Sequence, residues 1–431
     1  MRRGDRWVEH DQKPYLISLI NMPDNRTTRN SIVHDWTSEP RTAEAWLDRA
    51  AEAAAILAED AIERDRANQI PHEEIQLLRD SGLLTLLGPA EYGGGGQTWS
   101  LAYKVVREIA RADGSIAQLL GYHYKWSHLP RHQGTTDQWE RLERESTVNR
   151  WLWGGAANPR DADLVATDEG EYISFSGFKS FSTGGRVADV MVLEGVLDGF
   201  DDEHVFTVVP TDDDGFFHYG DWDNLGQRLT ESGSIEIKDV RAGWEDALGW
   251  VDKVRQRRTY DTITLPTQQL VFVNMYLGIA QGAVEAAARY TNERTRAWLF
   301  ADVDRAVDDP YILQTYGQFA SDLAAVEALA DKAGTELEAI HADPDALTER
   351  RRGEIAVLVA QAKIKSAQTS LDITSRLYEV LGARATANVY GFDRYWRNVR
   401  THTLHDPVAY KLKEVGEYVL RGEIPEPSWY T

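Results

Sequence analysis

The stretch 171-EYISFSGFKSFS-182 decides the fold, because its short-period pattern interrupts a chain that is otherwise spaced for helices. Alternating and aromatic residues of this kind are typical of β-strands, and Asp168-Glu169-Gly170 supplies a turn before them. Two nearby runs, VMVLEGVL (190–197) and HVFTVVP (204–210), are rich in β-branched residues. The sequence therefore predicts a β domain in the middle of the chain.

Helical spacing surrounds this block on both sides. Leu101, Val105 and Ile109 recur at every fourth position, which places them on one helix face. C-terminal to the β block, helical patterns cover 264–298, 311–341 and 348–381. We expect an α+β fold that is mainly α, in four parts: an N-terminal extension at 1–40, a helical domain at 41–147, the β domain at 148–245 and a C-terminal four-helix bundle at 246–431.

Composition excludes several classes of protein. The 431 residues contain no cysteine, so disulfides, thiolate nucleophiles and sulfur-bound metal clusters are ruled out. A net charge of −22 gives no electrostatic basis for binding nucleic acid or anionic membranes. No stretch reads as a membrane span of about 20 apolar residues, and the first residues do not form a signal peptide. We expect a soluble, cytoplasmic protein.

Four consecutive glycines, Gly93–Gly96, raise the question of a phosphate-binding loop. The P-loop motif also needs Gly-Lys-Ser/Thr at the start of a helix, and neither feature follows here. A tight turn is therefore the better interpretation. No Gly-x-Gly-x-x-Gly motif follows a strand either, so nothing predicts a site for NADH.

Several longer segments carry a resemblance. LLRDSGLLTLLGPAEYGGGG (77–96), GFKSFSTGGRVADV (177–190) and YLGIAQGAVEAAARYTNERTR (276–296), in this order of domains, resemble the acyl-CoA dehydrogenase superfamily from about Ala43 to the C-terminus. Within it, DWDNLGQRLTESGS (221–234) and YGFDRYWRNVRTHTLHDPVAYK (390–411) are most similar to the dibenzothiophene monooxygenase subgroup.

The resemblance implies a two-component enzyme. Members of the subgroup use reduced FMN, delivered by a separate NAD(P)H:flavin reductase, and O2 as cosubstrate. A flavin C4a-hydroperoxide then oxygenates a hydrophobic aromatic or heterocyclic substrate, and sulfur is the expected atom, as in desulfurization. The superfamily also implies a homotetramer, in which the long helix at 348–381 lies between subunits.

Proton-handling residues follow from the same match. Dehydrogenases of the superfamily use a carboxylate base, whereas the C-terminal segment here reads Leu404-His405-Asp406-Pro407. An imidazole with a pKa of about 6.5 can give or take a proton at neutral pH, so His405 is the first catalytic candidate. His123 and Thr183 match two further active-site positions; a lone histidine such as His123 is otherwise more often structural.

Binding residues carry over one by one. The resemblance assigns the flavin to Asn158, Ser182, Thr183, Arg296 and Arg384, with Arg384 supplied by a neighbouring subunit. A guanidinium fork suits a phosphate dianion, although a surface ion pair is the ordinary role of a single arginine. Tyr124, Trp126 and Trp222 are candidate walls of a substrate pocket, and core packing is the alternative for each.

Some features leave alternatives open. His402 and His405 are spaced by three residues and lack a third ligand, so we expect no metal there. Gly155 and Thr183 replace an asparagine and a serine of the subgroup, which leaves the substrate open. The competing hypotheses are an FAD-dependent acyl-CoA dehydrogenase, an N-oxygenating or aromatic-hydroxylating relative, and a helical scaffold without catalysis.

Overall fold

The computed structural model describes residue 36 and residues 40–158, 163–200 and 203–428. It divides into two compact units, Met1–Thr37 and Ser38–Thr431, and every element described below belongs to the second. The expected N-terminal extension, residues 1–40, lies almost entirely outside the described residues.

Helices fill the N-terminal part, as predicted. They are α1 (Ala43–Ala58), α2 (Ala61–Ala67), α3 (His72–Asp80), α4 (Trp99–Ala112), α5 (Gly114–Gln133) and α6 (Thr136–Asn149), with two 3-10 turns, η2 (Leu83–Thr85) and η3 (Ala90–Tyr92), between α3 and α4. Side-chain caps fix several starts: the Thr42 hydroxyl accepts from the Ala45 N–H at 3.2 Å, and the Asp113 carboxylate accepts from the Ser115 N–H at 2.9 Å. The predicted apolar face of α4 is buried.

The glycine run forms a tight turn, as predicted. A Cβ on Gly94 would lie 2.3 Å from the Gly88 carbonyl oxygen, and one on Gly95 would lie 2.6 Å from the Leu86 carbonyl oxygen. Gly93 has a φ of +84°, which glycine adopts without strain. These positions need glycine because two backbone segments touch there.

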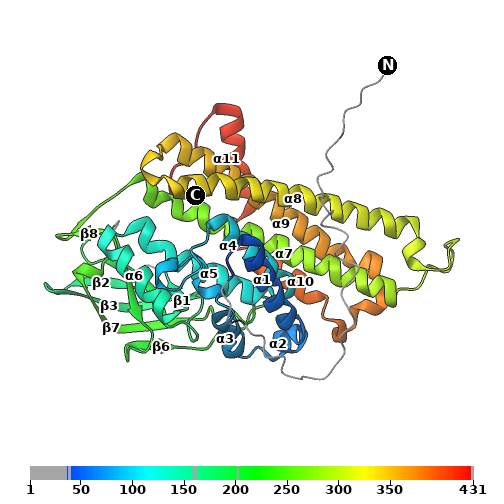
Figure 1. Ribbon diagram of the computed structural model, residues 1–431, viewed down its shortest axis with the longest axis horizontal. Coiled ribbons are helices and arrows are strands. Elements are labelled where there is room, and N and C mark those ends of the chain that lie inside the picture. The colour runs from blue at the N-terminus through cyan, green and yellow to red at the C-terminus, as the bar shows by residue number, and fades with distance from the viewer. Residues whose placement is uncertain (1–35, 37–39, 159–162, 201–202, 429–431) are drawn as a thin grey trace, which may run out of the picture. The chain divides into compact units, whose positions relative to one another are not determined.

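A seven-stranded sheet follows the helices (Figure 1). Its strands are β1 (Trp153–Ala156), β2 (Val165–Asp168), β3 (Tyr172–Lys179), β4 (Val190–Leu197), β5 (His204–Pro210), β6 (Phe216–His218) and β7 (Ile235–Gly243). The order is β1-β4-β2-β3-β7-β6, with β5 paired to β4. Residues 171–182 thus form β3 and the turn that follows it. β3 pairs antiparallel with β7. A two-stranded hairpin, β8 (Trp250–Val251) and β9 (Val254–Arg255), comes after the sheet.

Long helices form the C-terminal part. After the 3-10 turn η5 (Thr259–Ile263) they are α7 (Thr264–Glu293), α8 (Pro310–Ala342), α9 (Glu349–Leu381), α10 (Asp393–His402) and α11 (Val408–Arg421). α7 ends at Glu293, earlier than the predicted 298, and α9 ends before Gly382 as predicted. The α+β class, mainly α, is confirmed.

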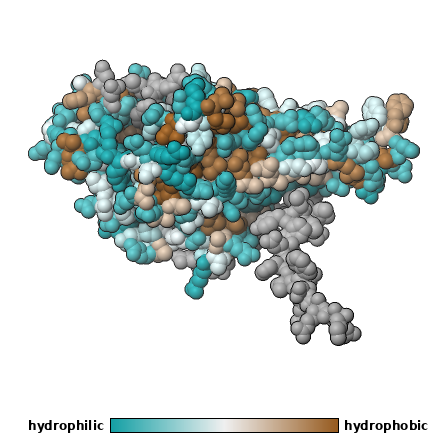
Figure 2. Space-filling model, turned by 90° about the horizontal axis from the view of Figure 1, so that it is seen from above, coloured by the Kyte–Doolittle hydropathy of each residue, from teal (hydrophilic) through white to brown (hydrophobic). Residues whose placement is uncertain are grey.

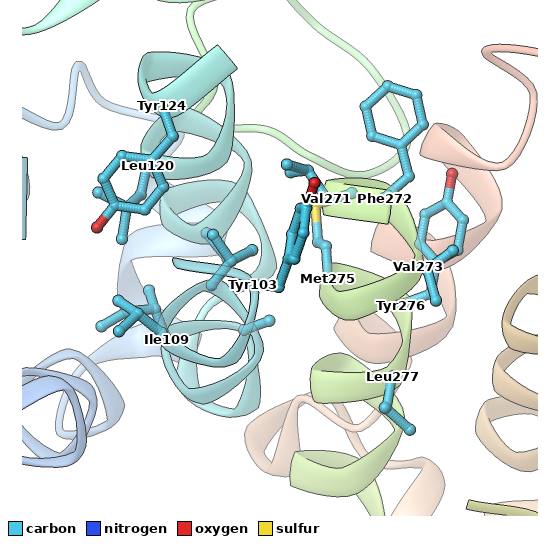
Figure 3. Packing of buried hydrophobic residues seen from close by; sticks show 14 of the residues in the cluster. Tyr103, Ile109, Leu120, Tyr124, Val271, Phe272, Val273, Met275, Tyr276 and Leu277 are labelled. Carbon is cyan, nitrogen blue, oxygen red and sulfur yellow. The ribbon is translucent and has the colours of Figure 1, made fainter. Parts of the chain in front are cut away.

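α7 is the central helix of the core. Figure 3 shows its side chains between α4 and α5 on one side and the C-terminal segment on the other, where Phe272 and Tyr276 project. Contrary to the sequence analysis, one described stretch, Thr259–Glu293, is long and apolar enough to cross a membrane. Of its most apolar window 78% is buried inside the protein, so core packing accounts for its apolar character.

Candidate active site

The turn that leaves β3 carries the predicted flavin residues. A buried ion pair anchors this turn, because Lys179 Nζ lies 2.7 Å from Glu194 Oε2 and also donates to the Asn158 carbonyl oxygen at 3.0 Å. The Asn158 amide in turn donates to Ser180 Oγ at 3.4 Å. Asn158, on the loop after β1, is therefore held against the turn that contains Ser182 and Thr183.

Hydroxyl groups line this turn. Thr183 Oγ1 lies 2.9 Å from Ser232 Oγ, which lies 2.8 Å from Thr230 Oγ1. Ser182 differs from them: its side chain is buried, and its hydroxyl has no hydrogen-bond partner among the described residues. A buried hydroxyl without a partner costs about 1–3 kcal/mol, and a bound molecule with an acceptor atom would remove that cost. The flavin ring offers such acceptors, so this end of the site fits the expected cofactor.

Gly155 on β1 makes room for Trp126 of α5. A Cβ at position 155 would lie 2.2 Å from Trp126 Cε2 and 2.4 Å from its Nε1, so the indole rests on the bare backbone. The Gly155 N–H donates to the Thr183 carbonyl oxygen at 3.2 Å, which joins this contact to the hydroxyl-lined turn. Trp126 is buried, and its Nε1 also lacks a partner among the described residues.

Lys125 links this contact to the C-terminal segment. Its Nζ lies 3.2 Å from the centre of the Trp126 ring and 5.9 Å from that of Tyr122. Burial holds the pKa of Lys125 well below its ordinary value. Its charge also acts on the His405 imidazole, whose pKa it helps to lower. Lys125 was not predicted from the sequence, because a lysine on an amphipathic helix is ordinarily solvated.

His405 lies at the other end of this chain of contacts. Its Nδ1 is 3.2 Å from Asp406 Oδ1, and its ring lies 5.1 Å from the Phe272 ring between centres. Burial first, and then the charges of Lys363 and Lys125, lower the pKa of His405 to about 3. The side chain of His405 is nevertheless 37% accessible, so solvent still reaches the imidazole. At neutral pH this imidazole is uncharged.

Asp406 orients His405 and is itself held in place. The carboxylate is buried, pairs with Lys363 of α9, and accepts from Gln269 Nε2 at 3.0 Å. An ionised carboxylate beside Nδ1 fixes the imidazole tautomer, with the Nδ1 proton directed at Asp406. Lys363 was also missed by the sequence analysis; its position on the apolar face of the helix at 348–381 was the only available signal.

His402 has a different environment. Its Nδ1 lies 2.7 Å from the Tyr276 hydroxyl and its Nε2 lies 3.3 Å from the Tyr122 hydroxyl. Its ring stacks on that of His405 at 5.7 Å between centres. Both nitrogens are thus occupied by tyrosines, and His402 serves to support the ring of His405.

His123 and Tyr124 are both enclosed in the core. His123 Nε2 lies 2.6 Å from the Leu84 carbonyl oxygen, and Nδ1 accepts from the Trp153 N–H at 3.2 Å. Burial lowers the pKa of His123 to about 4. The Tyr124 hydroxyl donates to the Leu83 carbonyl oxygen at 2.8 Å. The two side chains therefore fasten α5 to η2 and β1, and the hydrogen bonds described for their polar atoms lead away from the hydroxyl-lined turn.

Trp222 does lie beside that turn. Its ring meets the Phe181 ring edge-on at 6.0 Å, and its Nε1 donates to the Gln227 carbonyl oxygen at 2.8 Å. Phe181 precedes Ser182 and is 64% exposed. Trp222 is half-buried.

Arg296 and Arg384 are brought together, but away from the turn. Both are exposed, and Thr295 Oγ1 donates to the Leu381 carbonyl oxygen at 3.3 Å, which joins their two segments. The two arginines follow the C-terminal ends of α7 and α9, and these ends lie at the side of the bundle remote from the sheet (Figure 1). Within one chain the two arginines and Ser182 therefore do not form one site.

Sequence comparisons place relatives along most of the chain. The acyl-CoA dehydrogenase C-terminal domain matches residues 270–409, and the acyl-CoA dehydrogenase N-terminal domain matches residues 41–143. A dibenzothiophene monooxygenase from Mycolicibacterium goodii is 40% identical over 381 residues, which is 85% of this chain and 92% of the relative. A probable FMNH2-dependent monooxygenase, SfnC from Pseudomonas putida, is 38% identical over 91% of this chain and 98% of the relative.

A solved structure agrees with these relatives. The methanesulfinate monooxygenase MsuC from Pseudomonas fluorescens superposes with a TM-score of 0.87 at 37% identity. The match covers 89% of this chain and 99% of that protein.

Proposed function

This chain belongs to the dibenzothiophene monooxygenase family within the acyl-CoA dehydrogenase superfamily, and on that basis we propose that it is a reduced-FMN-dependent monooxygenase acting at sulfur. The observation that carries this proposal is the pair His405–Asp406, with Nδ1 and Oδ1 3.2 Å apart. It stands where the dehydrogenases need a carboxylate base, and it provides an oriented imidazole instead.

Reduced FMN supplies, when bound, the two electrons that allow one atom of O2 to enter the substrate while the other leaves as water. Ser182, Thr183 and Asn158 are the residues of this chain that would hold its ring end. The buried hydroxyl of Ser182 supports this assignment, because it has no hydrogen-bond partner among the described residues and a bound flavin would supply an acceptor. The reductant comes from a separate NAD(P)H:flavin reductase.

Arg296 and Arg384 would hold the phosphate of FMN bound to a neighbouring copy of the chain. Their exposure, and their place at the end of the bundle remote from the sheet, support a site shared between subunits. Apolar side chains lie exposed in the same region, among them Trp298 at 68%, Leu299 at 82% and Phe300 at 82%. Apolar groups also gather elsewhere on the helical surface (Figure 2). We therefore propose a homotetramer. We also propose that the protein is located in the cytoplasm.

His405 is the residue that moves a proton. Its Nδ1 proton is directed at Asp406, so Nε2 is the nitrogen that takes up and returns a proton at the reacting oxygen. Lys363 pairs with Asp406 and holds it in place. His123 acts as a positioning residue, because its two nitrogens tie β1 and η2 together beneath the site. Thr183 would orient the flavin ring, because its carbonyl oxygen is held by the Gly155 N–H and its hydroxyl is held by Ser232.

Aromatic side chains select the substrate. We propose that Trp222, which is half-buried, and the buried side chains of Trp126, Phe272 and Tyr124 contribute apolar surface that suits a thioether or thiophene sulfur. A second candidate substrate class is a small alkylsulfinate, which the similarity to MsuC supports. Lys125, whose Nζ lies beside Trp126, would donate a hydrogen bond to a sulfinate.

The test supplies reduced FMN to the anaerobic protein and then adds oxygen with either dibenzothiophene or methanesulfinate. We expect an oxygenated sulfur product from one of them, with hydrogen peroxide formed in less than stoichiometric amount. Complete conversion of the reduced FMN to hydrogen peroxide with both substrates would contradict sulfur oxygenation. A butyryl-CoA sample, tested in parallel with oxidised FAD, checks the dehydrogenase alternative.

A further inference from the structure

Three histidines meet at a place that the proposed flavin chemistry does not use. His128 and His132 lie one turn apart on α5, and His341 lies in the last turn of α8. One ring nitrogen from each residue falls within 4.8 Å of the other two. The ring centres are 4.9 Å to 5.6 Å apart.

Two of these imidazoles have a buried nitrogen that no described residue satisfies. Nε2 of His128 and Nε2 of His132 lack hydrogen-bond partners among the described residues. Buried polar atoms are ordinarily paired, and two such atoms in one cluster call for a common cause. Packing against Trp99 and Tyr260 accounts for the ring positions, but it leaves these nitrogens unpaired.

A threonine directs the lone pair of His132 into the cluster. Thr264 Oγ1 donates its proton to the Asp261 carbonyl oxygen at 2.9 Å. It therefore accepts from His132 Nδ1, which lies 3.2 Å away, and Nδ1 carries the ring proton. Nε2 of His132 is then a lone-pair donor. This arrangement, with the second nitrogen held by a hydrogen bond, is how metal-binding histidines are oriented in proteins.

His341 has a similar support. The Tyr260 hydroxyl lies 2.9 Å from Nδ1, and Thr267 Oγ1 lies 3.3 Å from Nε2. Thr267 Oγ1 also donates to the Ile263 carbonyl oxygen at 2.9 Å, so it keeps a partner when Nε2 turns away. Because the Thr267 proton is used in this way, Thr267 accepts from Nε2, and coordination through Nε2 requires the ring proton to move to Nδ1, where the Tyr260 hydroxyl oxygen accepts it.

The charge state of the cluster also suits a cation ligand set. Burial, together with the charges of neighbouring histidines and Arg131, keeps the pKa of His128 and of His132 well below the ordinary value. Burial lowers the pKa of His341 to about 3. Arg131 itself is paired with Glu143 at 2.6 Å, and Arg258 donates to the His132 carbonyl oxygen at 2.6 Å. All three imidazoles are therefore neutral at pH 7, the form that binds metals.

We propose that His128, His132 and His341 form a site for a divalent transition metal of the zinc and cobalt class. Such ions take imidazole nitrogens at about 2.0–2.1 Å, which places tetrahedral ligand atoms about 3.4 Å apart. The nitrogens must therefore close by at most about 1.4 Å, a movement that rotation of the rings supplies. A water molecule is the usual fourth ligand of an ion held by three protein side chains. The bound ion ties α5 to the end of α8.

Cobalt provides the direct test. Protein without a histidine tag is stripped of metal and titrated with Co²⁺, with the visible absorption of four-coordinate cobalt as the readout. We expect saturation at one ion per chain, displacement of cobalt by Zn²⁺, and a rise in melting temperature on binding. Thr264→Val should weaken the affinity about 10- to 100-fold, because it removes only the orienting hydrogen bond. His72→Gln, an exposed histidine on α3, is the matched control and should change nothing.

His132→Gln should abolish the cobalt spectrum, and His128→Gln serves if that variant does not fold. Equal cobalt affinity in the wild type, in His132→Gln and in His128→Gln would overturn the proposal. Bound cobalt that stays six-coordinate would also overturn it. Oxygenation by the metal-stripped protein is measured alongside and should persist. The test of the metal site and the test of the flavin site can therefore give negative results independently of each other.

Discussion

Gly155→Ala tests how the site is built. The added Cβ would lie 2.2 Å to 2.5 Å from three atoms of the Trp126 indole, whereas carbon atoms in contact are ordinarily about 3.5–4.0 Å apart. The ring must therefore move by more than about 1 Å. Trp126 is only 4% exposed, so the movement displaces packed neighbours. Overpacking of this kind costs about 1–3 kcal/mol of unfolding free energy.

The indole also carries Lys125 on its face, so its displacement should disturb the site. We expect product yield per reduced FMN to fall, with hydrogen peroxide rising in its place. Urea unfolding gives the stability change, and product analysis gives the yield. Gly317→Ala is the matched control: the same substitution in α8 meets nothing within 4 Å and should be neutral or slightly stabilising.

A double-mutant cycle makes the test specific. Trp126→Phe shortens the ring and should restore much of the stability that Gly155→Ala loses, with a coupling of about 0.5–3 kcal/mol. Strictly additive effects would show that the two residues do not touch. A Gly155→Ala variant as stable and as productive as Gly317→Ala would refute the packing described here.

Three other predictions concern single residues. His405→Phe should lower product formation by about 10²- to 10⁴-fold while FMN affinity stays within a few-fold, and full coupling of oxygen to product would remove His405 from the chemistry. Arg296→Ala or Arg384→Ala should weaken FMN binding about 10- to 100-fold by equilibrium titration, and unchanged affinity in both would exclude them. The pKa of His123 is about 4 in the folded protein, below its ordinary 6.5, so the unfolded chain binds more protons between these values. Stability is therefore retained above pH 6.5 and lost toward pH 4, by about 3 kcal/mol for this group, and His123→Asn should flatten that loss in urea unfolding.

The order of helices and strands was predictable because it depends on local periodicity. The strand pattern at 171–182 and the stop at Gly382 are both legible in the sequence, and both are observed. The same reasoning failed for the hydropathy of Thr259–Glu293. Buried glutamine and asparagine lie among its apolar residues, so the sequence did not read as a membrane span, although its mean hydropathy is that high.

Buried charge was not predictable from the sequence. Lys363 and Lys125 look like ordinary helix-surface lysines until the fold encloses them, because burial of a lysine is decided by distant segments. The three-histidine cluster joins α5 to α8 across a long separation in sequence, so no local spacing could reveal its third member. The roles of Ser182, Thr183, Arg296 and Arg384 rested on family resemblance alone and remain predictions.

Labelled oxygen tests the proposed monooxygenase activity directly. The protein is supplied with reduced FMN, the sulfur substrate that gives product, and ¹⁸O2, and the product is analysed by mass spectrometry. We predict one ¹⁸O atom in each product molecule, with no product when reduced FMN is omitted. Product that carries oxygen from water, or product formed equally well without reduced FMN, would contradict the assignment as a flavin-dependent monooxygenase.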